Sequence, residues 1–267
     1  MTHAEVSTER RYPLPLERGL ILASLLVLAA LAWAALVWQA GSIDMGMGMG
    51  MGLTMNMSAA LFLSLWVAMM VAIMFPTAAP MILTFATVQR NRRQRGQPFV
   101  PAWLFTLSYI AMWSATGFIA YAIAAGGDEL ASQVDWIADN ASRIGGGVLV
   151  VAGLYQLSPL KERCLSTCRT PMSFILSNWR SGRLGALRMG LEHGAYCLGC
   201  CWFLFAILFP LGMMNIAAMA IIALVIFAEK SLAIGRGVAR GAAVVLIAYG
   251  ALVAVAFPGA LPTTMTV

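Results

Sequence analysis

The feature that most constrains this chain is a series of long apolar runs separated by short polar segments. A helix needs about 20 apolar residues to cross about 30 Å of hydrocarbon. Hydrophobic residues make up 61% of the chain and charged residues 10%, whereas soluble domains carry roughly a quarter charged residues. The sequence therefore predicts an all-α, polytopic transmembrane helical bundle, and it excludes soluble enzymes, disordered scaffolds and small disulfide frameworks. The seven candidate spans are 19–40, 59–88, 102–125, 144–160, 189–209, 213–228 and 238–257.

Two of these runs are short, so six spans are an alternative. The run 144–160 opens with three glycines at 145–147, and the Pro-Leu-Gly break at 210–212 is consistent with a kink instead of a full loop. The first run is too long for the apolar region of a signal peptide, so we expect it to be a retained helix.

The distribution of Lys and Arg sets the expected orientation, because cytoplasmic loops are enriched in these residues. With seven spans and a cytoplasmic N-terminus, all of these residues except Arg143 fall on the cytoplasmic side, and the C-terminus lies outside. The net charge of +6 is therefore attributed to membrane topology and not to nucleic-acid binding. Residues 1–267 are expected to form one integral membrane domain, because no linker divides them. Its non-spanning parts are a cytoplasmic tail (1–18), an outer loop (41–58) and a cytoplasmic loop (161–188).

The fifth run carries a histidine and three cysteines at helical spacing. At about 100° per residue they share one helix face, which offers imidazole and thiolates to a soft or borderline metal. One helix cannot surround an ion alone, so either other helices contribute ligands or each site has only two or three ligands. Cu(I) accepts such low coordination numbers more readily than zinc does. The alternative is that buried free cysteines act as small hydrophobic residues, with the histidine satisfied by Glu192 or Glu229. The four residues are His193, Cys197, Cys200 and Cys201.

A second cysteine pair, Cys164 and Cys168, lies in the cytoplasmic loop with a spacing that suits one helical turn. This spacing alone is a weak signal. The pair is interpreted either as the point where the same metal enters or leaves, or as two unpaired cytosolic thiols.

The outer loop alternates methionine with glycine. Thioether sulfur is a soft ligand that favours Cu(I), and alternate glycines leave the chain free to wrap around an ion. The alternative is a low-complexity linker. Met69, Met70 and Met74 continue sulfur into the next helix, although such methionines taken alone are typical of a hydrophobic core. The loop methionines are Met45, Met47, Met49, Met51, Met55 and Met57.

The segment 189–202, MGLEHGAYCLGCCW, resembles the HGxYCxGCCW signature of a bacterial family of predicted metal-binding integral membrane proteins. The resemblance extends from about Trp66 to Gly237, and the Gly-Met repeat is not part of it. It implies a multi-pass protein of the bacterial inner (cytoplasmic) membrane that binds a metal, with no established reaction. The other segments that carry the resemblance are 157–161, 164–172, 213–215, 229–230, Met69-Met70, Pro76 and Pro80.

The chemistry of these groups favours acquisition, transfer or delivery of copper(I), with weak outer thioethers and tighter inner thiolates. Glu192 and Glu229 are expected beside the ligands. The alternative is a membrane-bound copper oxidoreductase, or its membrane subunit, working with a partner protein. Because His193 is the one histidine in the body of the chain, a site built by this chain alone suits metal holding or electron transfer better than oxygen activation.

Zinc or iron transport is least favoured, because harder ions prefer carboxylates. The sequence contains no phosphate-loop motif, so it does not predict pumping driven by a nucleotide. The expected partners are the lipid bilayer and a metal ion. The sequence leaves open whether the chain is an enzyme, whether it has a partner subunit and whether it forms oligomers.

Overall fold

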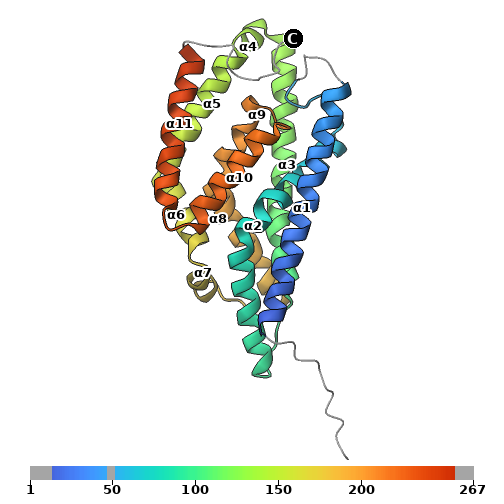
Figure 1. Cartoon of the computed structure of the whole chain (residues 1–267), viewed down its shortest axis with the longest axis vertical. Helices are drawn as coiled ribbons and strands as arrows, with labels where there is room; N and C mark the ends of the chain where they lie inside the picture. The colour runs from blue at the N-terminus through green and yellow to red at the C-terminus, as the bar shows by residue number, and fades with distance from the viewer. Residues whose placement is uncertain (1–13, 47–51, 256–267) are drawn as a thin grey trace, which may run out of the picture.

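The computed structural model describes residues 14–46 and 52–255, which are helical with no strand in either range. The predicted all-α bundle is confirmed (Figure 1). Its elements are α1 (Leu14–Gly46), α2 (Ala59–Gln94), α3 (Ala102–Gln133), α4 (Asp135–Asp139), α5 (Ala141–Gln156), α6 (Pro159–Arg169), α7 (Pro171–Ser177), α8 (Gly182–Ala206), α9 (Leu208–Leu211), α10 (Ile216–Ser231) and α11 (Gly235–Val255).

Five helical segments of the described part are long and apolar enough to cross a membrane. The remaining two expected spans correspond to α5 and α10, which have 16 residues each and so rise only about 24 Å. The break at 210–212 is a turn and not a kink, since Gly212 has φ 90° and the Asn215 side chain caps α10. The five segments are Leu16–Ser42, Ala59–Gln94, Ala102–Gln133, Gly182–Leu211 and Gly235–Val255.

Helices α3 and α8 pack closely because glycines on α8 leave room for the α3 backbone. A Cβ atom on Gly190 would lie 2.4 Å from the carbonyl oxygen of Phe105, and one on Gly194 would lie 2.8 Å from Cβ of Met112. Small residues allow such close approach between helices in membranes. Residue numbers on the two helices rise together across this contact, so α3 and α8 run parallel.

Two parallel neighbours require the chain to return between them, and α5 provides the return. It packs antiparallel against α11, where a Cβ on Gly146 would lie 2.7 Å from the carbonyl oxygen of Gly250 and one on Gly153 would lie 2.9 Å from that of Ala243. Figure 1 shows α5 and α11 side by side along the long axis of the bundle. This arrangement favours α5 as a crossing helix despite its length.

The short α5 and α10 shape the region around the cysteines. α5 ends at Gln156 and α10 ends at Ser231. At the level where α5 and α10 end, α6 packs against α8 and α10. α6 begins with Pro159 at its first position, and the Ser158 side chain accepts a hydrogen bond from Lys161 N. α6 carries Cys164 and Cys168 and packs against α8, and Figure 1 shows these two helices near each other.

Topology reporters distinguish seven spans from five. We expect reporters fused after Val134, Asn178 and Gly212 to report outside, inside and outside, because α5 and α10 both cross in the seven-span arrangement. If only the five long segments cross, the same fusions report outside, outside and inside. Paired phosphatase and fluorescent-protein fusions at each point make the measurement, and the second pattern would contradict the prediction.

Candidate metal centre

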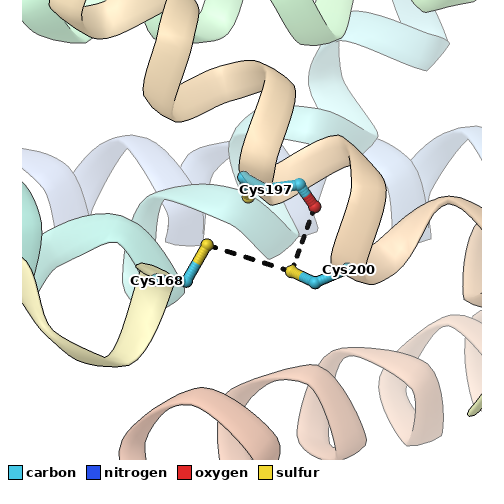
Figure 2. Close-up of side chains that lie close together, drawn as sticks. All are labelled: Cys168, Cys197 and Cys200. Atoms are coloured by element: carbon cyan, nitrogen blue, oxygen red, sulfur yellow. Dashed lines mark hydrogen bonds between the residues drawn. The ribbon is translucent and has the colours of Figure 1, made fainter. Parts of the chain in front are cut away.

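Three cysteine sulfurs from two helices converge inside the bundle. The Sγ atoms of Cys168 on α6 and of Cys197 and Cys200 on α8 all lie within 4.8 Å of one another. Figure 2 shows Cys168 facing Cys200 across the space between their helices, with 3.9 Å between the two sulfurs. With metal–sulfur bonds of about 2.3 Å, three sulfurs around an ion in one plane lie about 4.0 Å apart. Little movement is therefore needed to close a trigonal site.

The local sequence of α8 sets up this arrangement. Cys197 and Cys200 are three residues apart and share a face, and the Cys200 thiol donates to the carbonyl oxygen of Cys197 over 3.2 Å. Gly199 lets α6 approach, because a Cβ there would lie 2.7 Å from the Cys164 sulfur. The Tyr155 hydroxyl of α5 donates to the Gly199 carbonyl over 2.5 Å and fixes the same turn from the other side.

Cys197 lies at the centre of the polar contacts. Lys230 Nζ of α10 donates to its sulfur over 2.9 Å, and the Tyr109 hydroxyl of α3 lies 3.0 Å from it. The thioether sulfur of Met74 on α2 lies 3.9 Å away. Four helices besides α8 therefore meet at this residue once Cys168 of α6 is included, and Met74 offers a fourth sulfur beside the triangle.

The other residues of the predicted cysteine–histidine face are buried but lie outside the triangle. The Cys201 sulfur is 3.3 Å from that of Cys200. His193 stacks on Tyr109 and Phe105 and packs against Phe174, with ring centroids 5.3 to 6.0 Å apart. Its Nδ1 atom has no hydrogen-bond partner among the described residues. The structure thus brings the imidazole into an aromatic cage and not to the three sulfurs.

The predicted methionines separate into several groups. Met70 is fully buried on α2, as is Met74 beside Cys197, while Met57 and Met69 line a small cavity elsewhere. Met55 is half-buried against the core. Met45 lies in the last turn of α1, but its side chain is not described. Met47, Met49 and Met51 lie outside the described residues.

The two predicted carboxylates have basic partners. Glu192 accepts from Arg180 and Arg188 near the surface. Glu229 lies in the interior, where Lys161 Nζ is 2.7 Å from its Oε2 and Gln156 Nε2 donates to its Oε1 over 2.9 Å. Lys161 also donates to the Gln156 side-chain oxygen. This buried network ties α6 to α5 and α10.

Sequence reasoning missed Lys161, Gln156, Tyr109 and Lys230 as parts of the site. The charge distribution predicts that both lysines lie in cytoplasmic loops, yet Lys161 is 1% exposed. A usable signal was the position of Lys161 directly after the apolar run 144–160, since Glu229 likewise follows directly after the run 213–228. Tyr109 gives no comparable signal in a run that is apolar and aromatic throughout.

The thiols on α6 are protonated more readily than free cysteines. Burial raises the pKa of Cys164. The hydrogen-bonding interaction with Cys197 raises the pKa of Cys168 well above its ordinary value, and burial adds to the shift. A thiol must lose its proton to bind a metal. Metal binding through Cys168 would therefore release a proton, and it would strengthen as the pH rises toward the pKa of this thiol.

A bundle of membrane-crossing helices with buried thiols from two helices is typical of a membrane protein that binds a soft metal. The family model of the PpoB2 copper chaperones matches residues 63–253, well over half of the chain. The chain belongs to this copper chaperone family. No curated protein and no solved structure matches it. The match supports the metal-binding family that the resemblance implies, without itself naming the family of predicted metal-binding integral membrane proteins.

The buried Lys161–Glu229 pair should control the stability of the α6 contact. In Lys161→Met, Glu229 is left charged and buried, so we expect a loss of about 3–5 kcal/mol in the free energy of unfolding. The double variant Lys161→Met/Glu229→Leu should recover most of this loss, because an apolar pair of similar volume replaces the ions. Thermal unfolding of the detergent-purified protein measures both.

A matched control is Arg188→Met, which removes an ion pair at the surface, where Arg188 is 64% exposed. Its effect should stay within about 1 kcal/mol. Equal stability losses in Lys161→Met and Arg188→Met would contradict a structural role for the buried pair.

Proposed function

We propose that the protein carries copper(I) as cargo on the Cys168–Cys197–Cys200 triangle, and that it acts in copper acquisition and in delivery to a partner protein. The observation that carries this proposal is the convergence of three thiols from α6 and α8 within 4.8 Å, in a chain of the copper chaperone family. In this proposal copper is transported cargo and not a resident cofactor.

The donor set favours Cu(I) over zinc or iron. The cluster of metal-binding side chains in the described part consists of three cysteines. Two further sulfurs lie beside it, that of Cys201 at 3.3 Å from Cys200 and the soft thioether of Met74 at 3.9 Å from Cys197. Soft thiolate and thioether ligands select Cu(I), whereas harder ions prefer oxygen. The Glu229 carboxylate is held by Lys161 and Gln156 and does not join the cluster.

Transfer needs a ligand that can leave the site, and α6 is suited to supply it. Cys197 and Cys200 are buried on α8, a helix packed along α3, whereas Cys168 and Cys164 are half-buried on the 11-residue α6. Exchange of a thiolate on α6 for one on a partner protein would pass the ion through two- and three-coordinate steps that Cu(I) tolerates. We therefore assign Cys197 and Cys200 to holding, and Cys168 and Cys164 to release.

Delivery is favoured over the alternative of a copper oxidoreductase. The triangle contains sulfur alone, and His193 lies in an aromatic cage apart from it. Sulfur ligation stabilises Cu(I) and resists the cycling to Cu(II) that oxygen activation requires. The copper chaperone family of the chain supports the same choice.

Copper(I) titration of cysteine variants tests the proposal. Cys168→Ser, Cys197→Ser and Cys200→Ser should each weaken Cu(I) binding at least tenfold, about 1.4 kcal/mol, because each removes one of three ligands. The measurement is anaerobic competition between the purified protein and a Cu(I) chelator, followed by the thiolate-to-copper ultraviolet absorption.

The matched control is Cys164→Ser, a cysteine of the same helix as Cys168 whose sulfur packs on Gly199 outside the triangle. Its equilibrium affinity should stay within about threefold of the parent. Unchanged affinity in all three triangle variants, or an equal loss in Cys164→Ser, would overturn the assignment.

A further inference from the structure

A second group of sulfur-containing residues lines a small cavity between α1, α2 and α10, near the α1–α2 and α9–α10 connections. Nine residues line it, all apolar, and the cavity volume is about 10 Å³, roughly the space of one water molecule. Two lining residues are the aromatic Phe62 and Trp66. Because five of the nine are methionines, we call this space the methionine cavity. The five are Met57, Met69, Met213, Met214 and Met219.

Methionine is strongly concentrated here. The chain has 18 methionines in 267 residues, so nine residues drawn at random would include fewer than one. A water molecule in a buried cavity needs polar partners, and these side chains offer none. Met69, Met213 and Met219 are 2%, 7% and 0% exposed, so their thioethers lie in the protein interior. A cavity of this size and lining suits a single soft cation.

The loop that supplies Met57 is fixed by contacts with α3. The Asp128 carboxylate accepts hydrogen bonds from Leu53 N over 2.5 Å, from Thr54 N over 2.9 Å and from Thr54 Oγ1 over 2.6 Å. Gly52 leaves room for this carboxylate, because a Cβ there would lie 2.4 Å from its Oδ1.

The backbone between this clamp and Met57 is strained. Met55 and Asn56 have φ values of 53° and 52°, in the left-handed region that a methionine rarely adopts. Strain of this kind persists where surrounding contacts impose it, and it is frequent at ligand sites. The contacts of Asp128 thus hold the end of the methionine-rich loop over the cavity.

We propose that the methionine cavity is a second copper(I) site, made of thioethers, which passes its ion to the cysteine triangle. The inference rests on the proposed function and adds a donor site to it. Thioethers are neutral and hold Cu(I) more weakly than thiolates do, so the free energy favours movement toward the cysteines. No redox step is involved, since sulfur ligands exchange around an ion that remains Cu(I).

Helix α2 connects the two sites. Met69 lines the cavity, and Met74 lies 3.9 Å from the Cys197 sulfur. Five residues along a helix rise about 7.5 Å, so about 1.4 turns of α2 separate the two residues along its axis. Met70 lies between Met69 and Met74 in the sequence, and its fully buried side chain adds a further thioether to this stretch. Three methionines of α2 thus lie along the short stretch of helix that reaches from the cavity to the triangle.

Copper(I) stoichiometry of the purified full chain tests the proposal. The triple variant Met69→Leu/Met213→Leu/Met219→Leu should lose one equivalent of the weaker-bound Cu(I) and keep the tight one. Leucine preserves volume and hydrophobicity, so the fold should tolerate the change. The measurement is a chelator competition at two chelator strengths, with circular dichroism to check the helix content.

A matched control is Met81→Leu, a methionine of α2 that is 2% exposed and does not line the cavity. It should lose no equivalent. If the triple variant retains every equivalent of the parent, or if Met81→Leu loses the same one, the methionine cavity is not a copper site.

The cysteine variants keep this outcome separate from the proposed function. Cys168→Ser/Cys197→Ser/Cys200→Ser should lose the tight equivalent and keep the weaker one that the methionine variant lacks. If the cysteine variant binds normally, the proposed function fails. If it behaves as expected while the methionine variant is unchanged, the proposed function stands and the second site is overturned.

Discussion

The candidate metal centre depends on the contact between α6 and α8. The triangle needs Cys168 of α6, and α6 reaches α8 because α5 and α10 end early and because Gly199 has no side chain to obstruct Cys164. The buried Lys161–Glu229 pair, with Gln156, ties α6 to its neighbours. Separating those charges in an apolar interior is costly, so the pair defines where α6 can lie. The position of one candidate metal ligand, Cys168, thus follows from an ion pair outside the triangle.

The sequence was informative where a property depends on one helix. Apolar runs gave the helical bundle, and three- and four-residue spacings placed the cysteines of α8 on one buried face. It was uninformative where a property depends on how helices pack. Nothing local indicates that Cys168 meets Cys200, or that His193 stacks among Phe105 and Tyr109.

The methionines illustrate the same limit. The repetitive Gly-Met segment attracts attention in the sequence, whereas Met213, Met214 and Met219 lie outside it and resemble ordinary core residues. Folding brings these three to one cavity with Met57 and Met69. Two sulfur environments result, thioethers in the cavity and thiolates at the triangle, and α2 joins them. Their expected difference in affinity gives a copper carrier a direction of transfer without an energy source.

The central claim is that sulfur alone holds the copper. X-ray absorption at the copper edge of the Cu(I)-loaded protein, at one equivalent per chain, tests it most directly. The account predicts three or four sulfur neighbours at about 2.3 Å. It also predicts no imidazole signal, and an unchanged spectrum in the His193→Ala variant. Nitrogen scattering that disappears in His193→Ala would contradict the account, because the histidine would then be a ligand and sulfur alone would not hold the copper.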